Sequence, residues 1–485
     1  MTRVLTLGIV ASWLVLVAVL VRKQAPPESL PSTPLPLTGV ATRDEWFGIY
    51  QAGQKIGHAH RVVATHTGGY TFSEDSSVAL AMLGVPQTLG STLRAETDDT
   101  FALRAFSYTL VTPATTFTAS GTSDDHTLRA RYGPQGHESD LVLPLTEPIA
   151  LPSTLRPRIL ADHPAPGTRY SLPVFSPLTA RSEPMTVVVE GRERLETRAG
   201  TVDTIRIAEE HQGVQTRAWI DPDGNVVREE GLLGFTLERE PREQALAGVD
   251  GNAPLDLVAM SRIPLEGTIA NPRALAELTL RVRGQAATMI PSDPPRQRFT
   301  DDLLRIAREA LPEHPPAAGD LDGGAPANAL AASPFIESDD PAIQAQAGAI
   351  KGDATDPRIV ARRLVDWVHA QVEKTPSVTV PSAREVLASR RGDCNEHAVL
   401  LAALARAAGI PARVIAGAVY ANDGFYYHAW NELWVGAWVS ADAVFDQLPA
   451  DATHVKLIEG GLERQVALAG IIGQLAFAVV EEMPR

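Results

Sequence analysis

The stretch RRGDCNEHAVLLAALARAAGIPARV, residues 390–414, decides the fold of the C-terminal part of the chain and contains its single cysteine. Residues 395–408 are mostly alanine and leucine, which favour a helix. Gly409, with Pro411 two residues later, is a typical stop signal. The pattern therefore predicts a helix with Cys394 in its first turn.

A lone cysteine cannot form a disulfide within the chain, so Cys394 is either a small buried hydrophobic residue or a nucleophile. At a helix start, free backbone N–H groups and the helix dipole stabilise a negative charge. The pKa of a cysteine there can fall below its ordinary value of about 8.5. The backbone N–H of Cys394 is also the predicted donor to the oxyanion of a tetrahedral intermediate.

The segments after the predicted helix have the pattern of three strands, ARVIAGAVYA, FYYHAWNELWV and WVSADAVFD. His428 lies in the middle of the second segment and Asp442 near the end of the third. A cysteine at a helix terminus, followed by a histidine and an acid on neighbouring strands, is the order that a Cys–His–Asp triad needs. In such a triad the histidine takes the thiol proton and the acid orients the imidazole.

These residues resemble the transglutaminase-like superfamily, whose core is related to the papain fold. The matching segments are Gly392-Asp393-Cys394, Glu396, Gly409-Ile410-Pro411-Ala412-Arg413, His428-Ala429-Trp430 and Trp438-Val439-Ser440-Ala441-Asp442. The resemblance covers roughly residues 340–460 and implies an α+β papain-like domain. It also implies that Cys394 is the nucleophile, His428 the general base and acid, and Asp442 the orienting acid.

The register of the hairpin that carries His428 and Asp442 is open. A two-residue turn at 436–437 would pair His428 with Phe445 and turn Asp442 to the other face, because side chains alternate with period two. A wider loop or a bulge would restore the facing of Asp442. If neither occurs, Asp446 is the alternative acid.

Four nearby residues have competing interpretations. His397 is an alternative base, but a supporting polar contact is the simpler role, and Glu396 either suits the first helical turn or assists substrate binding. Trp430 is expected to pack beside the histidine. Trp367 is at helical spacing within DPRIVARRLVDWVHAQVEK, which favours core packing over a substrate tunnel.

The first residues have a different composition. No charge occurs from Val4 to Val21, a length just sufficient to cross a bilayer as a helix. The run ends at Arg22 and Lys23 without the small-residue cleavage site of a signal peptide, so we predict an uncleaved anchor, with a signal peptide as the alternative. We expect a single-pass inner-membrane protein with a periplasmic body, since long domains translocate largely regardless of flanking charge.

Composition shifts suggest the domain organisation. We expect a membrane anchor over residues 1–23, a proline-rich linker over 24–42, a β-rich region of one or more domains over 43–300, a linker over 301–338 and the transglutaminase-like domain over 339–485. The short alternating runs of the β-rich region predict a large antiparallel sheet, half-barrel or sandwich. The apolar stretch at 466–480 is too short for a second span and predicts a core helix or strand.

Composition and motifs also exclude several functions. The net charge of −15 argues against a nucleic-acid surface. His58 and His60 share one face of a predicted strand but have no evident third metal ligand, and the calcium-loop-like segments at Asp221 and Asp320 lack a glutamate at the twelfth position. The sequence has no phosphate loop or dinucleotide fingerprint. We therefore expect no metal and no cofactor.

The sequence thus predicts a cysteine-dependent acyl-transfer enzyme that acts on protein or peptide amides through a thioester. Water would complete hydrolysis, and a lysine-type amine would complete transamidation. A wet extracytoplasmic compartment and the lack of a calcium motif favour hydrolysis. The alternative is a non-catalytic, membrane-anchored binding or scaffold module that retains a transglutaminase-like domain.

Overall fold

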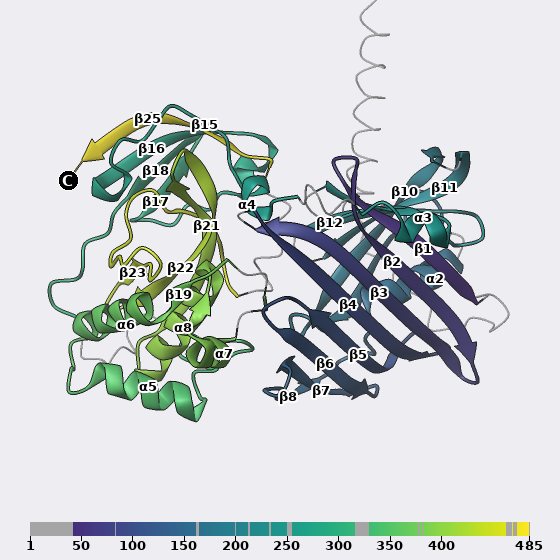
Figure 1. The fold of residues 1–485 in the computed structure, drawn as a ribbon, viewed down its shortest axis with the longest axis horizontal. Coiled ribbons are helices and arrows are strands. Elements are labelled where there is room, and N and C mark those ends of the chain that lie inside the picture. The colour runs from purple at the N-terminus through teal and green to yellow at the C-terminus, as the bar shows by residue number, and fades with distance from the viewer. Residues whose placement is uncertain are drawn as a thin grey trace, which may run out of the picture.

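The computed structural model describes residues 42–484, apart from 83, 162–163, 199, 212–213, 232–233, 250–254, 316–328, 377–378, 381, 462–467 and 469–472. The predicted anchor, residues 1–23, and the linker up to residue 41 lie outside the described residues. Within the described part, no helix is both long and apolar enough to cross a membrane. The described chain forms two bodies that lie side by side (Figure 1).

The first body is built on one sheet of fourteen strands, with neighbours antiparallel, which confirms the predicted large antiparallel sheet. Its strands are β1 (Arg43–Gln51), β2 (Gln54–His66), β3 (Gly69–Met82), β4 (Val85–Asp98), β5 (Leu103–Val111), β6 (Thr116–Ser123), β7 (Thr127–Pro134), β8 (Ser139–Pro144), β9 (Arg169–Ser176), β10 (Arg181–Thr197), β11 (Gly200–His211), β12 (Val214–Ile220), β13 (Val226–Glu230) and β14 (Phe235–Arg239). The helices are α2 (Pro152–Ala161), α3 (Arg242–Leu246) and α4 (Leu257–Met260).

Two meanders, β1–β8 and β9–β14, make up this sheet and join where β1 pairs with β14. Short turns connect successive strands, and the β1–β2 turn shows the local cause. Ala52 and Gly53 both have positive φ, the conformation of a hairpin turn that matches the right-handed twist of the strands.

The second body has a four-stranded sheet in the order β23-β22-β21-β24. Its strands are β21 (Ala412–Ala421), β22 (Gly424–Trp434), β23 (Trp438–Ala441) and β24 (Val455–Glu459), and its helices are α5 (Pro341–Lys351), α6 (Pro357–Gln371), α7 (Ala383–Ser389) and α8 (Cys394–Ala407). The helices gather at one end of the sheet (Figure 1). They share a core with β21, β22 and β23, so the C-terminal region has the expected α+β character.

A five-stranded sheet, β15-β25-β16-β18-β17, packs on the other part of β21, β22 and β24. Its strands are β15 (Leu265–Glu266), β16 (Leu275–Arg283), β17 (Gln297–Thr300), β18 (Leu303–Ala307) and β25 (Ala476–Pro484). The short elements η2 (Pro272–Ala274), η3 (Gln285–Met289), β19 (Glu373–Lys374) and β20 (Arg391–Gly392) complete the fold. The expected division at residue 300 falls between β17 and β18 of this sheet, so residues 275–307 belong to the C-terminal body.

Aromatic packing joins the two bodies. The ring of Phe335 lies 5.9 Å from that of Phe117 and 5.8 Å from that of Tyr132, and it is buried with the core of the first meander. The backbone oxygen of Phe335 in turn accepts the N–H of Ala383, the first residue of α7. The large sheet is therefore connected directly to the helices around Cys394.

Candidate active site

Cys394 is the first residue of α8. The side chain of Asp393 accepts the N–H of Asn395 at 2.8 Å, and the side chain of Glu396 accepts the N–H of Asp393 at 2.8 Å. This reciprocal cap fixes the start of the helix. Gly392 approaches the cap so closely that a Cβ there would lie 2.2 Å from Cβ of Glu396. A glycine is therefore needed at position 392, because any side chain there would clash with Glu396.

The surroundings of the thiol differ from the sequence-based expectation. Cys394 is half-buried, and the backbone N–H of Ala429 on β22 lies close enough to lower the pKa of its thiol. Burial of the thiol and the charge of Asp393 raise the pKa of Cys394 well above its ordinary value. The direction is opposite to the expected lowering, because burial and the charges of Asp393, Glu396 and Asp442 disfavour the thiolate. The thiol therefore needs a base to lose its proton near neutral pH.

The register question is answered by the β22–β23 hairpin. Trp434 pairs with Trp438, which leaves the three-residue loop 435–437. Asn431 pairs with Ala441, so Asp442 follows on the same face of the sheet as His428. The wider loop is thus the alternative that occurs. The other acid, Asp446, forms an ion pair with Arg362 at the surface.

His428 and Asp442 form a buried pair. Nε2 of His428 donates to Oδ2 of Asp442 at 2.7 Å, and the two residues are 5% and 0% exposed. Burial alone would raise the pKa of Asp442, but His428 and His454 lower it well below its ordinary value, so the carboxylate is ionised. With its proton on Nε2, neutral His428 has its lone pair on Nδ1. Among the described residues, no hydrogen bond engages that nitrogen.

Two contacts hold the helix that carries Cys394 against the strand that carries His428. The hydroxyl of Tyr427 donates to Oδ1 of Asn395 at 2.8 Å. Nδ2 of Asn431 donates to the backbone oxygen of Ala398 at 2.9 Å. These contacts hold the first turns of α8, which begins at Cys394, against β22, which carries His428.

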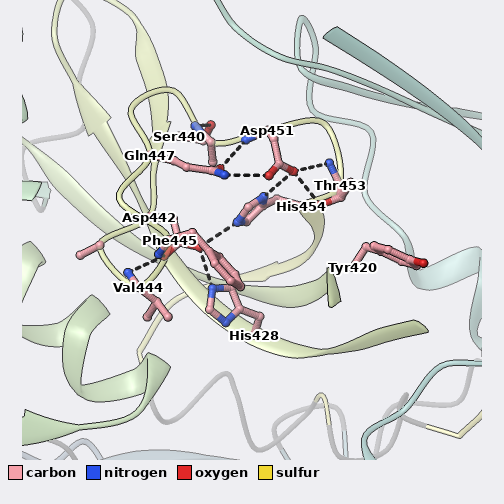
Figure 2. A network of polar contacts seen from close by, with 12 residues as sticks. Tyr420, His428, Ser440, Asp442, Val444, Phe445, Gln447, Asp451, Thr453 and His454 are labelled. Carbon is pink, nitrogen blue, oxygen red and sulfur yellow. Dashed lines mark hydrogen bonds and ion pairs between the residues drawn. The ribbon is translucent and has the colours of Figure 1, made fainter. Parts of the chain in front are cut away.

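A second histidine contacts the same carboxylate. Nε2 of His454 lies 2.8 Å from Oδ2 of Asp442, and its Nδ1 lies 3.3 Å from Oδ1 of Asp451. Figure 2 shows the two imidazoles around Asp442, with Asp451 beyond His454. His454 lies in a loop twelve residues after Asp442, and no local pattern distinguished it in the sequence.

The remaining predicted residues have structural contacts. Nδ1 of His397 donates to the backbone oxygen of Asp393 at 2.7 Å, and Glu396 also contacts Thr379. Trp430 stacks beside His428, with ring centroids 6.2 Å apart. Trp367 lies under the guanidinium of Arg390, 4.3 Å from its ring centroid.

A cavity of about 380 Å³ adjoins this region and is lined by both bodies. Gly392, Glu396, Thr375 and Glu385 line it from the C-terminal body. Pro113 and Ala114, in the loop between β5 and β6, line it from the large sheet. The space beside the start of α8 is therefore shaped partly by the first body.

The possible metal ligands have other polar contacts. Donor atoms of His428, Asp442 and His454 lie within 4.8 Å of one another, but the hydrogen bonds at 2.7 and 2.8 Å already account for this arrangement. His60 stacks on Trp46 and contacts Asp44 at 2.8 Å, and the described residues supply no three-ligand group that includes it. Asp320 lies outside the described residues.

Residues 344–443 match the model of the transglutaminase-like superfamily, so the C-terminal region carries a transglutaminase-like domain. Three solved structures are similar to the chain. A β-barrel-like protein of a domain of unknown function from Brucella abortus has 12% identity, 41% coverage of this chain, 94% of that chain and a TM-score of 0.33. A candidate cysteine protease from Cytophaga hutchinsonii has 18% identity, 43% coverage of this chain, 87% of that chain and a TM-score of 0.28. A candidate protease from Parabacteroides distasonis has 13% identity, 76% coverage of this chain, 66% of that chain and a TM-score of 0.21. No curated protein matches the sequence.

Proposed function

We propose that the protein is a cysteine-dependent enzyme that hydrolyses amide bonds of peptides or proteins through a Cys394–His428–Asp442 triad. The buried 2.7 Å hydrogen bond between His428 and Asp442 is the observation that supports this proposal most strongly. It orients the imidazole of His428, and the backbone N–H of the next residue in the strand, Ala429, lowers the pKa of the Cys394 thiol. The family match of the domain supports the same class of chemistry.

The proposed reaction begins with transfer of the Cys394 thiol proton to Nδ1 of His428. The sulfur then attacks the amide carbonyl carbon, and the carbonyl electrons move to the oxygen. The N–H of Cys394 is the proposed donor to that oxyanion, because N–H groups of a first helical turn have no partner within the helix. Asp393 and Glu396 satisfy the N–H groups on either side of it.

Collapse of this intermediate breaks the C–N bond, and the leaving amine takes the proton from His428. A thioester remains on Cys394. Water then attacks the thioester while His428 accepts its proton, and the carboxylic acid product leaves as the thiol is restored. A lysine-type amine in place of water would give transamidation. We favour water because we also propose that residues 4–21 anchor the chain with its body in a wet compartment outside the cytoplasm, and because the sequence has no calcium motif.

The first test measures alkylation of the full chain by iodoacetamide against pH, since Cys394 is the only thiol. We expect His428→Ala to slow alkylation near neutral pH at least about tenfold, because a thiol with a raised pKa depends on its base. His397→Gln, which changes the other histidine near the thiol, should leave the rate close to wild type. A slow thiol that is indifferent to His428 would favour the non-catalytic scaffold module instead.

The second test separates the two acyl acceptors. Wild type is incubated with casein, alone or with a fluorescent primary amine, and new amino termini and amine incorporation are both quantified. Hydrolysis predicts new termini that disappear in Cys394→Ala. Incorporation of the amine without new termini would instead assign a transamidase.

A further inference from the structure

His454 lies outside the segment that matches the family model, residues 344–443. Its side chain is fully buried, and its two ring nitrogens face two different carboxylates, of Asp442 and Asp451. Carboxylates that are ionised can only accept hydrogen bonds. Both nitrogens of His454 must therefore carry protons, which makes the side chain an imidazolium.

Both carboxylates are held in the ionised state. Asp451 accepts Nη1 of Arg273 and Nε2 of Gln447, each at 2.8 Å, and it accepts the N–H and the hydroxyl of Thr453 at 2.8 and 2.6 Å. Burial alone would raise the pKa of Asp451, but His454 and Arg273 lower it well below its ordinary value. Burial alone would lower the pKa of His454, whereas its bonds to Asp442 and Asp451 raise it.

The charges around His454 alternate in sign. Asp442 and Asp451 are negative, and His454 and Arg273 are positive, so this row, which is buried except for Arg273, has no net charge. The neighbouring charged pair, Arg296 and Glu309, is neutral as a whole; Nη2 of Arg296 contacts the backbone oxygen of Asp451 at 2.7 Å. From α8, the charge of Asp442 affects the pKa of Cys394 and that of His397. His428 lies at its end, with its ring centroid 5.8 Å from that of His454.

We propose that His454 is a positioning residue for the proposed reaction: as an imidazolium between Asp442 and Asp451 it fixes the Asp442 carboxylate and offsets its charge, so that His428 stays neutral and can accept the Cys394 proton. This inference rests on the proposed function. Without the positive charge, the row would be net negative and would hold a proton on His428. A protonated His428 cannot act as the base.

The charge predicts a measurable shift. One unit charge at the 5.8 Å separation of the two rings, with an effective dielectric constant of about 20, corresponds to a shift of about 2 pH units. His454→Gln keeps an N–H donor near Asp442 and removes the charge. The acidic limb of the alkylation profile is the part where the alkylation rate of Cys394 falls as pH is lowered. In this variant the acidic limb should move to higher pH by about 1–2 units.

A charge rescue separates this role from a purely structural one. The double variant His454→Gln/Asp451→Asn removes one positive and one negative charge, so the row is neutral again. Its acidic limb should return toward wild type, although it has lost more native contacts than the single variant. His126→Gln, an exposed histidine in the turn between β6 and β7, is the matched control and should overlay wild type.

A spectroscopic measurement on the wild-type full chain needs no variant to fold. With ¹⁵N-histidine labelling, His454 should show two ring N–H protons at about pH 8, above the ordinary imidazole pKa of about 6.5. The signals are assigned by contacts with the rings of Trp430 and Phe445, whose centroids lie 5.2 and 6.1 Å from that of His454.

A single N–H on His454 at that pH, an unshifted limb in His454→Gln, or a double variant that stays shifted would each overturn the inference. Failure of the proposed function is distinct, because it is defined by His428→Ala. If His428→Ala alkylates like wild type, the triad fails even where His454 shows both protons. If His428→Ala is slow and His454→Gln overlays wild type, only the role of His454 fails.

Discussion

Replacing Asp442 with asparagine should destabilise the C-terminal body strongly, and by an amount that depends on pH. Oδ2 of Asp442 accepts two imidazole N–H groups, at 2.7 and 2.8 Å, and Oδ1 accepts the N–H groups of Val444 and Phe445 at 2.7 and 3.2 Å. An amide has one oxygen, so its NH₂ group must face N–H donors on one side. Removing one partner from a buried ion pair costs about 3–5 kcal/mol, and we expect a loss in this range near pH 6.

The pH dependence follows from two shifts of opposite sign. Asp442 has a pKa below its unfolded value, so its contribution is present above an ordinary carboxyl pKa of about 4 and is lost as pH falls toward the folded value. His454 has a raised pKa, so its contribution is complete below about 6.5 and is lost as pH rises through the folded value. The difference between wild type and Asp442→Asn should therefore be largest between about pH 4 and 6.5.

Pulse proteolysis provides the assay. A short pulse of thermolysin at increasing urea, with peptides from residues 412–459 quantified by mass spectrometry, reports unfolding of the C-terminal body separately from the large sheet. With a urea slope of about 2 kcal/mol per molar, the expected loss lowers the midpoint by about 1.5–2.5 M. Asp446→Asn is the matched control, because this exposed acid has only a surface ion pair and should change stability by less than about 1 kcal/mol.

Two results would contradict this account of the site. One is a difference between wild type and Asp442→Asn that is constant from about pH 4 to 9, which would mean that the ionisation of His454 is not linked to folding. The other is a loss no greater than that of Asp446→Asn, which would mean that the two imidazoles do not depend on the carboxylate.

Three further changes test other parts of the structure. Gly417 lies opposite His428, and a Cβ there would be 2.0 Å from the backbone oxygen of Val455, so Gly417→Ala should lower the melting temperature and disturb thiol reactivity together. Phe335→Ala removes the ring that joins the two bodies and should cost about 3–5 kcal/mol, seen as faster limited proteolysis between them. Burial alone would raise the pKa of Glu229, but two arginines lower it to about 2. Urea denaturation should therefore show that Glu229→Gln lowers the free energy of unfolding by about 3 kcal/mol above pH 4.5 and leaves it unchanged near pH 2.

The parts of the site that the sequence predicted have local causes. The start of α8 follows from Asp393 and Glu396, which form the cap, and its end follows from Gly409, whose φ is +87°. The placement of His428 on a strand follows from the aromatic and apolar residues around it. Local chemistry of this kind is readable because the partners lie within a few positions of each other.

The sequence raised the question of which face of the sheet Asp442 occupies but could not answer it. It depends on whether the hairpin loop contains two residues or three, and Gly436 with Ala437 suits the shorter turn. The chain instead includes Val435, whose N–H bonds to the backbone oxygen of Ala437 at 3.0 Å. One residue of register moves every later side chain to the other face, so no average propensity could decide it.

The direction of the Cys394 pKa was beyond the sequence for a different reason. A helix start lowers the pKa of a thiol, and the sequence shows the helix start. The larger opposing contributions are burial and the Asp393 charge, and burial depends on how β22 closes over the thiol. Tertiary packing determines the sign, and packing is not a local property of residues 390–414.

The site also depends on residues far upstream of the matched region. Arg273 balances the charge of Asp451, and Arg296 holds the backbone of the same residue, yet both lie before residue 344, where the family match begins. Their segment is anchored because β16 pairs with β25 at the C-terminal end of the chain. A chain starting at residue 339 would leave Asp451 without Arg273 and the row around His454 with a net negative charge. The unit that can perform the proposed chemistry is therefore larger than the domain that the sequence motifs define.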